Sequence, residues 1–210
     1  YLSDDDETLP VGHPVRSFHY RKNAFLCRDR FTEGDWVDRL FLRMELLGFV
    51  RDCLGLTKLY HYADPMSGYL INVQEDGETF PWHFDTNEFT ISIMLQKSED
   101  GGTFEYAPAI RNPESENYDG VSAVMVGERA DVRTLPLKPG DLQIFKGRFS
   151  LHRVTEVKGQ RPRYMAIFGY SEQPDVISRA SRKLKLFGRC HEAHLVAETQ
   201  RSIRTDELRD

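Results

Sequence analysis

Residues 81–89, PWHFDTNEF, place a histidine and an aspartate two positions apart, as His83 and Asp85. Residues i and i+2 of a β-strand project from the same face, so these two side chains are expected to converge. A third candidate, His152, lies further along the chain in SLHRVTEV. An isolated HxD pair arises readily by chance, but two histidines and one carboxylate on separate strands are suited to binding a divalent metal ion.

Two histidines and one carboxylate form the facial triad of non-haem Fe(II) sites, which leaves positions open for a co-substrate and O2. A 2-oxoacid that chelates the iron needs a cation for its far carboxylate, and Arg-Pro-Arg occupies positions 161–163. A guanidinium binds a carboxylate through two parallel hydrogen bonds. Arg163, which opens the expected strand RYMAIFGY, is favoured as the anchor, and Arg161 in the preceding turn is the alternative.

The expected strand YLINVQ supplies two further candidates, Asn72 for the co-substrate and Gln74 for the substrate pocket. The polar face of an edge strand explains both residues equally well. If Arg163 points inward, strand alternation puts an apolar row on the same face, made of Met165, Ile167 and Gly169. This row favours a substrate less polar than lysine, or one held mainly from other strands, and ordinary core packing is the alternative.

Short runs rich in Val, Ile, Phe, Tyr and Thr, separated by turn sequences such as EDGG and KPGD, predict antiparallel strands. These runs cover residues 69–74, 89–96, 102–108, 132–137, 141–147, 151–157 and 163–170. Their number and spacing favour an antiparallel barrel or sandwich over a βαβ fold. The loop 107–130 is long and polar enough to be a lid over the site.

Helical periodicity flanks these strands on both sides, so the expected class is mainly β with flanking helices (α+β). One domain is predicted over residues 1–210. It consists of four parts in chain order. They are an acidic lead-in (1–14), a helical segment capped by Asp35 (35–56), a strand-rich core (60–172) and a helical C-terminal segment (173–210). The basic run 179–189 is read as a solvated helix face.

The chain has 210 residues, a mass of 24.4 kDa and a formal net charge of −5. This acidic balance disfavours nucleic-acid and membrane partners. No apolar run reaches the ~18 residues that a membrane-spanning helix needs. Three scattered cysteines and no signal-like apolar segment favour a reducing, cytoplasmic setting. The sequence does not define the oligomeric state.

Several segments together resemble the 2-oxoglutarate/Fe(II)-dependent oxygenases, in particular the branch of free-amino-acid hydroxylases and related lysine halogenases. They are WHFD, GGTFEYAPAIR, ENYD, LPLKPGDLQIFKGRFSLHRVTEV and RPRYMAIFGY, within residues 60–175. The resemblance implies a double-stranded β-helix (jelly-roll) core and the iron ligands His83, Asp85 and His152. It also implies 2-oxoglutarate held by the arginine after the second histidine, O2 as co-substrate and ascorbate as a supporting reductant.

Halogenases of that branch replace the metal carboxylate by glycine, which leaves room for chloride, whereas Asp85 is present here. The resemblance therefore implies hydroxylation of an unactivated C–H in a small molecule, an amino acid or an amino-acid-derived metabolite, with release of succinate and CO2. Desaturation begins with the same hydrogen abstraction and stays open. The alternatives are a protein side-chain hydroxylase of prolyl-hydroxylase type and, in a different class, a non-catalytic metal-binding jelly-roll module.

Overall fold

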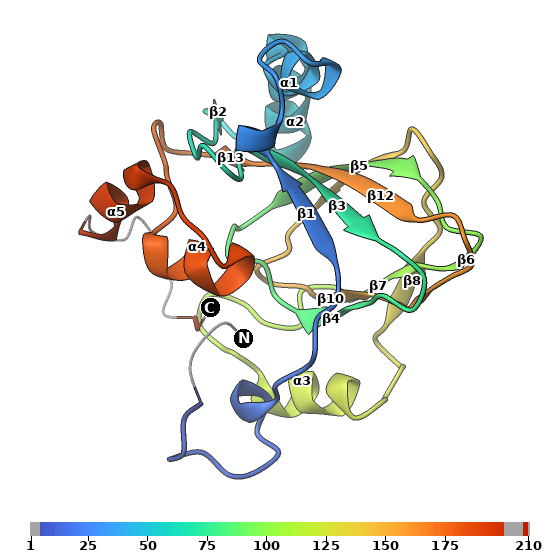
Figure 1. The fold of residues 1–210 in the computed structure, drawn as a ribbon. Helices are drawn as coiled ribbons and strands as arrows, with labels where there is room; N and C mark the ends of the chain where they lie inside the picture. The colour runs from blue at the N-terminus through green and yellow to red at the C-terminus, as the bar shows by residue number, and fades with distance from the viewer. Residues whose placement is uncertain (1–4, 200–207, 210) are drawn as a thin grey trace.

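A computed structural model of the chain describes residues 5–199 and 208–209. Its larger sheet is antiparallel, has five strands and runs in the order β1 (Ala24–Cys27), β3 (Tyr69–Gln74), β12 (Arg163–Phe168), β5 (Thr90–Gln96) and β9 (Leu142–Phe145). A second antiparallel sheet has the order β4 (Phe80–His83), β10 (Leu151–Val154), β7 (Phe104–Ala107) and β8 (Arg133–Leu135). The two sheets lie as separate layers (Figure 1).

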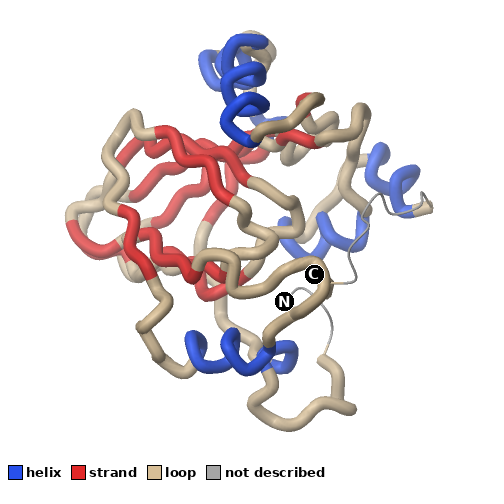
Figure 2. The backbone as a smooth tube through the Cα atoms, turned by 180° about the vertical axis from the view of Figure 1, so that it is seen from behind, coloured by secondary structure: helices blue, strands red, loops and turns tan. Residues whose placement is uncertain are grey.

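Two short strand pairs complete the β structure: β11 (Val157–Lys158) with β6 (Asp100–Gly101), and β13 (Tyr170–Ser171) with β2 (Tyr60–His61). The view from behind shows the two layers of strands with helices above and below them (Figure 2). The predicted strand-rich core with flanking helices is confirmed, although the sheets do not close into one barrel. That all 210 residues form one domain stays a prediction.

The space between the two sheets is filled by apolar side chains from both layers. Met94 and Met165 of the larger sheet pack against Phe104 and Val154 of the smaller one. Ile167 packs at the edge of the same cluster. The inward direction predicted for Met165 and Ile167 is therefore confirmed, and each side chain contributes to the hydrophobic core.

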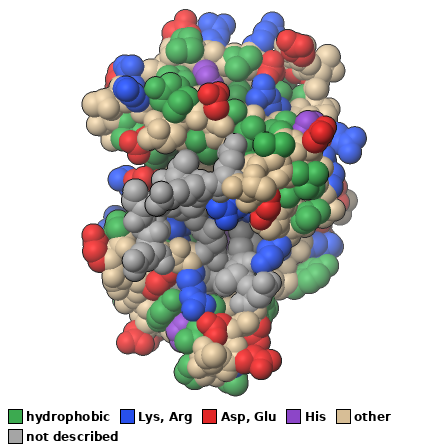
Figure 3. Space-filling view, turned by 90° about the vertical axis from the view of Figure 1, so that its left-hand side faces the viewer, with side chains coloured by type: hydrophobic (Ala, Val, Ile, Leu, Met, Phe, Trp, Pro, Cys, Tyr) green, Lys and Arg blue, Asp and Glu red, His purple; other side chains and the backbone are tan. Residues whose placement is uncertain are grey.

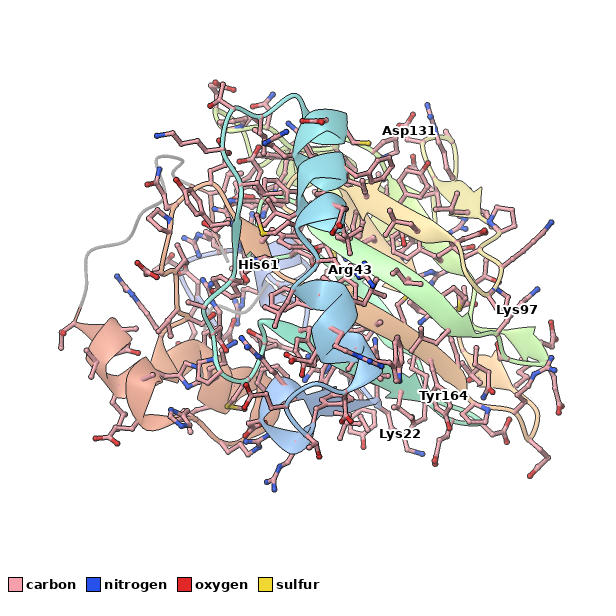
Figure 4. The ribbon with its side chains drawn as sticks, turned by 90° about the horizontal axis from the view of Figure 1, so that it is seen from above. Lys22, Arg43, His61, Lys97, Asp131 and Tyr164 are labelled. Carbon is pink, nitrogen blue, oxygen red and sulfur yellow. The ribbon has the colours of Figure 1, made fainter. Side chains whose placement is uncertain are left out.

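Two helices, α1 (Trp36–Phe41) and α2 (Met44–Leu54), cover the outer face of the larger sheet. The predicted helical segment over 35–56 thus consists of two helices divided near Arg43, which is labelled in the view from above (Figure 4). The prediction that Asp35 caps this helix with its side chain is wrong in detail, because the carboxylate accepts the N–H of Thr32 at 3.0 Å. The outward-facing Ala166 and Phe168 of β12 are buried beneath these helices.

The loop predicted as a lid over 107–130 contains a helix, α3 (Tyr118–Met125). Asn117 caps this helix through its side-chain oxygen, which accepts the N–H of Gly120 at 3.3 Å. Val121 and Val124 are buried against Phe84 and Leu151. This segment is therefore a packed support beside the HxD segment, and its apolar face contradicts the expectation of a polar lid.

The C-terminal segment contains α4 (Ala180–Phe187) and α5 (Glu192–Glu198), and the predicted helical structure at 200–207 and 210 lies outside the described residues. No helix in the described part is long and apolar enough to cross a membrane. Acidic and basic side chains are interspersed on the face shown in Figure 3. The reading of 179–189 as a solvated face is wrong for Lys183, which is only 2% exposed.

Lys183 is buried because it pairs with Asp64, which precedes β3. The Lys183 Nζ lies 3.1 Å from Oδ2 of Asp64, and Nε2 of His194 lies 3.2 Å from the same oxygen. Asp64 also accepts backbone N–H groups of Ser67 at 2.7 Å and Ser178 at 3.0 Å. This cluster fixes both C-terminal helices against the segment that leads into β3. The histidine of α5, His194, is held from both sides, because the backbone N–H of His191 also donates to its Nδ1 at 2.8 Å.

We expect Asp64→Asn to lower the free energy of unfolding at pH 7 by ~3–5 kcal/mol, because it leaves the buried Lys183 without its counter-ion. Burial raises the pKa of Asp64, but Lys183 and the backbone N–H donors outweigh it and lower the pKa to about 2. The carboxylate therefore stabilises the fold above its unfolded-state pKa of about 3.8, and this contribution is lost as the pH falls toward 2.

Urea unfolding at several pH values measures this contribution. The difference between wild type and Asp64→Asn should be largest near neutral pH and should shrink between pH 4 and pH 2. Asp52→Asn, which changes an exposed carboxylate on α2, is the control and should change stability by less than ~0.5 kcal/mol. A difference that is independent of pH would contradict an ionised Asp64.

Candidate metal centre and co-substrate site

His83 and His152 are brought together by strand pairing, because they occupy directly opposite positions of β4 and β10. Asp85 lies two residues beyond His83, past the end of β4, so the expectation that both side chains sit on one strand is wrong in detail. The backbone N–H of Asp85 donates to the carbonyl of Gly147 at 3.1 Å, which continues the pairing past the strand. One ligand atom from each of the three side chains lies within 4.8 Å of the others.

Both histidines are held with Nε2 facing the carboxylate. Nδ1 of His83 lies 2.8 Å from the carbonyl of Pro81, and Nδ1 of His152 lies 2.8 Å from the carbonyl of Ser150. A carbonyl oxygen only accepts, so each Nδ1 carries the proton and each Nε2 keeps a lone pair. The two Nε2 atoms lie 3.7 Å and 3.4 Å from Oδ1 of Asp85, which is the arrangement that a shared metal ion requires.

The protonation states suit metal binding at neutral pH. Burial and the neighbouring His152 ring lower the pKa of His83 to about 3, so this imidazole is neutral. Burial alone would raise the pKa of Asp85, but His152 and the Thr90 hydroxyl outweigh that effect and lower it to about 2. A neutral imidazole and an ionised carboxylate are the forms that ligate a metal.

Asp85 is oriented by contacts that leave one oxygen for the metal. The Thr90 hydroxyl donates to Oδ2 at 2.5 Å, while Oδ1 faces the two histidines. A Cβ added at Gly147 would overlap the carboxylate, so the glycine provides the space in which Asp85 lies. Thr90 and Gly147 were not predicted from the sequence. Gly147 acts through a contact with Asp85, which is distant along the chain, and Thr90, five residues from Asp85, acts through a side-chain hydrogen bond that strand periodicity does not indicate.

Aromatic rings surround the two histidines. Phe80 stacks on His83 with ring centroids 4.0 Å apart, and Phe145 contacts His152 edge-on at 4.9 Å. Phe104 lies 5.7 Å from the His152 ring. These rings keep the imidazoles in place and reduce the access of water to the ligand atoms.

Arg163 lies on the inner face of β12 and is 2% exposed. Its Nη1 donates to Oε1 of Gln74 at 3.1 Å, but its buried Nε has no partner, and neither has Nε2 of Gln74. None of the acidic side chains in the described ranges forms an ion pair with it. Burial lowers the pKa of Arg163 to about 10, still far above neutrality, so a buried cation with free donors lies here.

The two arginines of the predicted anchor differ sharply in their surroundings. Arg161 is exposed, and its Nη2 lies 3.4 Å from the carbonyl of Ser98. Only Arg163 offers unsatisfied N–H groups inside the core, where an anion is shielded from water. The geometry therefore supports Arg163 over Arg161 as the binding group for a carboxylate.

The other predicted pocket residues differ in their placement. Asn72 is buried opposite Met165 and accepts a hydrogen bond from Nδ2 of Asn23 at 3.0 Å. Gly169 lies beyond the end of β12, and a side chain there would meet Tyr62 and the backbone of Ser67 at 3.0 Å. The expectation that Gly169 lines the pocket is therefore wrong, since close packing fills that side of its Cα.

A family model described as Halogenase D matches residues 21–185. The chain belongs to this family. A search of curated proteins found no match to the sequence. The family is part of the 2-oxoglutarate/Fe(II)-dependent oxygenases, so the predicted relationship to halogenases of that superfamily is confirmed. The three predicted iron ligands converge so that they could hold a metal ion.

Solved structures with a similar fold include AviO1 from Streptomyces viridochromogenes Tue57, with 16% identity and a TM-score of 0.56 over 81% of this chain and 78% of that one. The non-heme alpha ketoglutarate dependent epimerase SnoN from nogalamycin biosynthesis has 13% identity and a TM-score of 0.53 over 71% and 61%. EvdMO1 has 17% identity and a TM-score of 0.53 over 75% and 38%. The chain thus spans less than two thirds of the last two structures, and the likeness establishes the jelly-roll fold.

Proposed function

We propose that the protein is a 2-oxoglutarate- and O2-dependent Fe(II) hydroxylase of a small molecule, an amino acid or an amino-acid-derived metabolite. The observation that carries this proposal is the convergence of three metal-ready ligand atoms together with a buried arginine that has no anionic partner among the described residues. When bound, Fe(II), 2-oxoglutarate and O2 supply the oxidising power to break an unactivated C–H bond, with release of succinate and CO2.

Each residue of the site has a defined part in this proposal. Nε2 of His83, Nε2 of His152 and Oδ1 of Asp85 would hold the metal. Arg163, oriented by Gln74, would hold the far carboxylate of 2-oxoglutarate. The surrounding aromatic side chains keep water from the reacting atoms, and the strands fix the geometry, because both histidines lie in the paired β4 and β10.

Halogenation is the second reaction to consider, because the matching family model is that of a halogenase. The presence of Asp85 argues against it here: the carboxylate occupies the space over Gly147 and supplies the third ligand atom. We expect hydroxylated product and no chlorinated product when turnover is run in chloride buffer and analysed by mass spectrometry. A chlorinated product from the wild-type protein would contradict this assignment.

Formation of succinate from 2-oxoglutarate, stimulated by a panel of amino acids and related metabolites, tests the proposed reaction. Stimulation by a small molecule, abolished by His83→Ala, is the expected result. Activity on a peptide library alone would favour a protein side-chain hydroxylase. Absence of succinate with every compound and peptide, despite bound Fe(II), would favour a non-catalytic metal-binding module.

Replacing Arg163 by leucine should weaken the binding of 2-oxoglutarate by at least ~30-fold, because truncating one partner of a buried charge pair costs ~2 kcal/mol or more. Isothermal titration of the Fe(II)-loaded protein without oxygen measures the affinity. Arg161→Leu is the matched control and should change it by less than ~3-fold, since this side chain is exposed. The opposite ranking of the two variants would assign the anchor to Arg161.

A cytoplasmic location is also our proposal. Cys27, Cys53 and Cys190 are all free thiols in the structure, and free thiols persist in reducing compartments.

A further inference from the structure

Arg21 carries a half-buried guanidinium at the edge of the core, three residues before the start of β1. Its central carbon lies 5.4 Å from the ring centroids of both Phe25 and Phe80. Nη2 donates to the carbonyl of Leu186 near the end of α4 at 2.8 Å. Within the described ranges no acidic side chain forms an ion pair with it, and burial lowers its pKa without an opposing acid. Most of its donors therefore stay available to an anion.

This cation lies next to the proposed metal centre. The Phe80 ring that contacts Arg21 is the one that stacks on His83, so a single ring separates the guanidinium from a metal ligand. A bridge between Lys22 and Thr79 holds the segment beside the start of β4. Arg163 lies on β12, and β3 runs between it and β1, so the two cations occupy different sides of β3. The site thus offers separate positions for two anions.

Asn23 adds a hydrogen-bond acceptor beside this cation. Strand alternation gives Asn23 the inward direction of Arg21 and Phe25. Its Nδ2 donates to Oδ1 of Asn72, while its own buried Oδ1 has no partner. An unsatisfied buried carbonyl is destabilising, so a ligand N–H donor placed here would bind favourably. A cation and an acceptor two residues apart, in the segment that leads into β1, match a carboxylate and an adjacent ammonium group.

The rest of the inner surface is apolar or neutral. Phe25, Phe80 and Ile167 supply apolar walls, and the inward positions of the described strands carry no acidic side chain. Asp85, after β4, is committed to the metal in the proposed function. A second ammonium group, such as that of lysine, would therefore be removed from water without a partner, at a cost of several kcal/mol.

We propose that Arg21 and Asn23 bind the carboxylate and ammonium groups of an α-amino acid whose side chain is uncharged and apolar. The inference rests on the proposed function, because it places the side chain of this amino acid toward the iron. It excludes lysine as the preferred substrate, although the family resemblance includes lysine halogenases.

Isothermal titration of the protein loaded with Fe(II) and 2-oxoglutarate, without oxygen, tests the inference without turnover. The probes are L-leucine and L-phenylalanine, with L-lysine as the cationic side chain. L-Leucinol lacks the carboxylate of leucine, and 4-methylpentanoate lacks its ammonium group. We expect leucine or phenylalanine to bind at least ~10-fold more tightly than the other three compounds, which corresponds to ~1.4 kcal/mol.

Variants separate binding from structural effects. Arg21→Gln should remove the preference for leucine over leucinol while leaving the affinity for leucinol unchanged. Asn23→Leu should remove the preference for leucine over 4-methylpentanoate. Lys22→Gln changes the exposed residue between them and is the control, which should keep both preferences.

The inference would be overturned by tighter binding of lysine than of both apolar amino acids, by an equal loss of leucine and leucinol affinity in Arg21→Gln, or by binding of none of the probes. A large loss of 2-oxoglutarate affinity in Arg21→Gln would also overturn it, by assigning Arg21 to the co-substrate. Binding with the expected preferences but no succinate on admission of oxygen would support the inference and contradict the proposed hydroxylase instead.

Discussion

Replacing His152 with alanine is expected to lower Fe(II) affinity and 2-oxoglutarate-dependent succinate formation by more than ~100-fold. Loss of a partner that only orients a metal ligand typically costs 10–100-fold, so loss of a ligand itself should cost more. His152 is 3% exposed and contacts Phe104 and Phe145, so the variant also leaves a small cavity. Anaerobic titration with Fe(II) and a succinate assay measure the two effects.

The variant His19→Ala provides the matched control, because His19 is exposed and lies away from the three converging side chains. It should keep wild-type affinity and turnover. Thermal unfolding of the metal-free His152→Ala protein reports on the cavity alone. Retention of Fe(II) affinity in a folded His152→Ala protein would remove this residue from the proposed ligand set.

Gly147→Ala is expected to lower Fe(II) affinity by ~10–100-fold, although Gly147 supplies no ligand atom. The added Cβ would overlap the Asp85 carboxylate. A small shift of Asp85 cannot relieve this overlap, because the Thr90 hydroxyl donates to Oδ2 and the backbone N–H of Asp85 donates to the Gly147 carbonyl. The carboxylate must therefore leave its position between the histidines, and anaerobic Fe(II) titration should detect the change.

Gly48→Ala is the control for this substitution, because Gly48 lies in α2 and a Cβ there meets nothing within 4 Å. It should preserve Fe(II) affinity and raise helix stability by ~0.5–1 kcal/mol. An Asp85→Gly background removes the clashing carboxylate, so adding Gly147→Ala to it should cost little further stability. If Gly147→Ala lowered the free energy of unfolding equally in both backgrounds, its effect would not depend on the Asp85 carboxylate.

The candidate ligand set could be predicted from residue types and their order in the chain, and its three side chains do converge. Imidazole and carboxylate groups are intrinsic to His83, Asp85 and His152, and the period-2 pattern of the flanking runs indicated strands that would place such groups on one face. Arg163 was predicted from its place at the start of the strand after His152, and alternation from it predicted the inward direction of Met165. These features depend on local geometry, and local geometry follows from the sequence of neighbouring residues.

The tertiary structure alone decided how these groups are held and what lies around them. Asp85 lies past its strand and is fixed by Thr90 and Gly147, α3 replaces the expected lid, and Lys183 is buried rather than solvated. The position of Arg21 against Phe80 also belongs here. Apart from the Thr90–Asp85 hydrogen bond, which joins residues five positions apart, each of these outcomes depends on a contact between residues far apart in the chain. Such contacts are determined by the packing of whole elements, which no local pattern encodes.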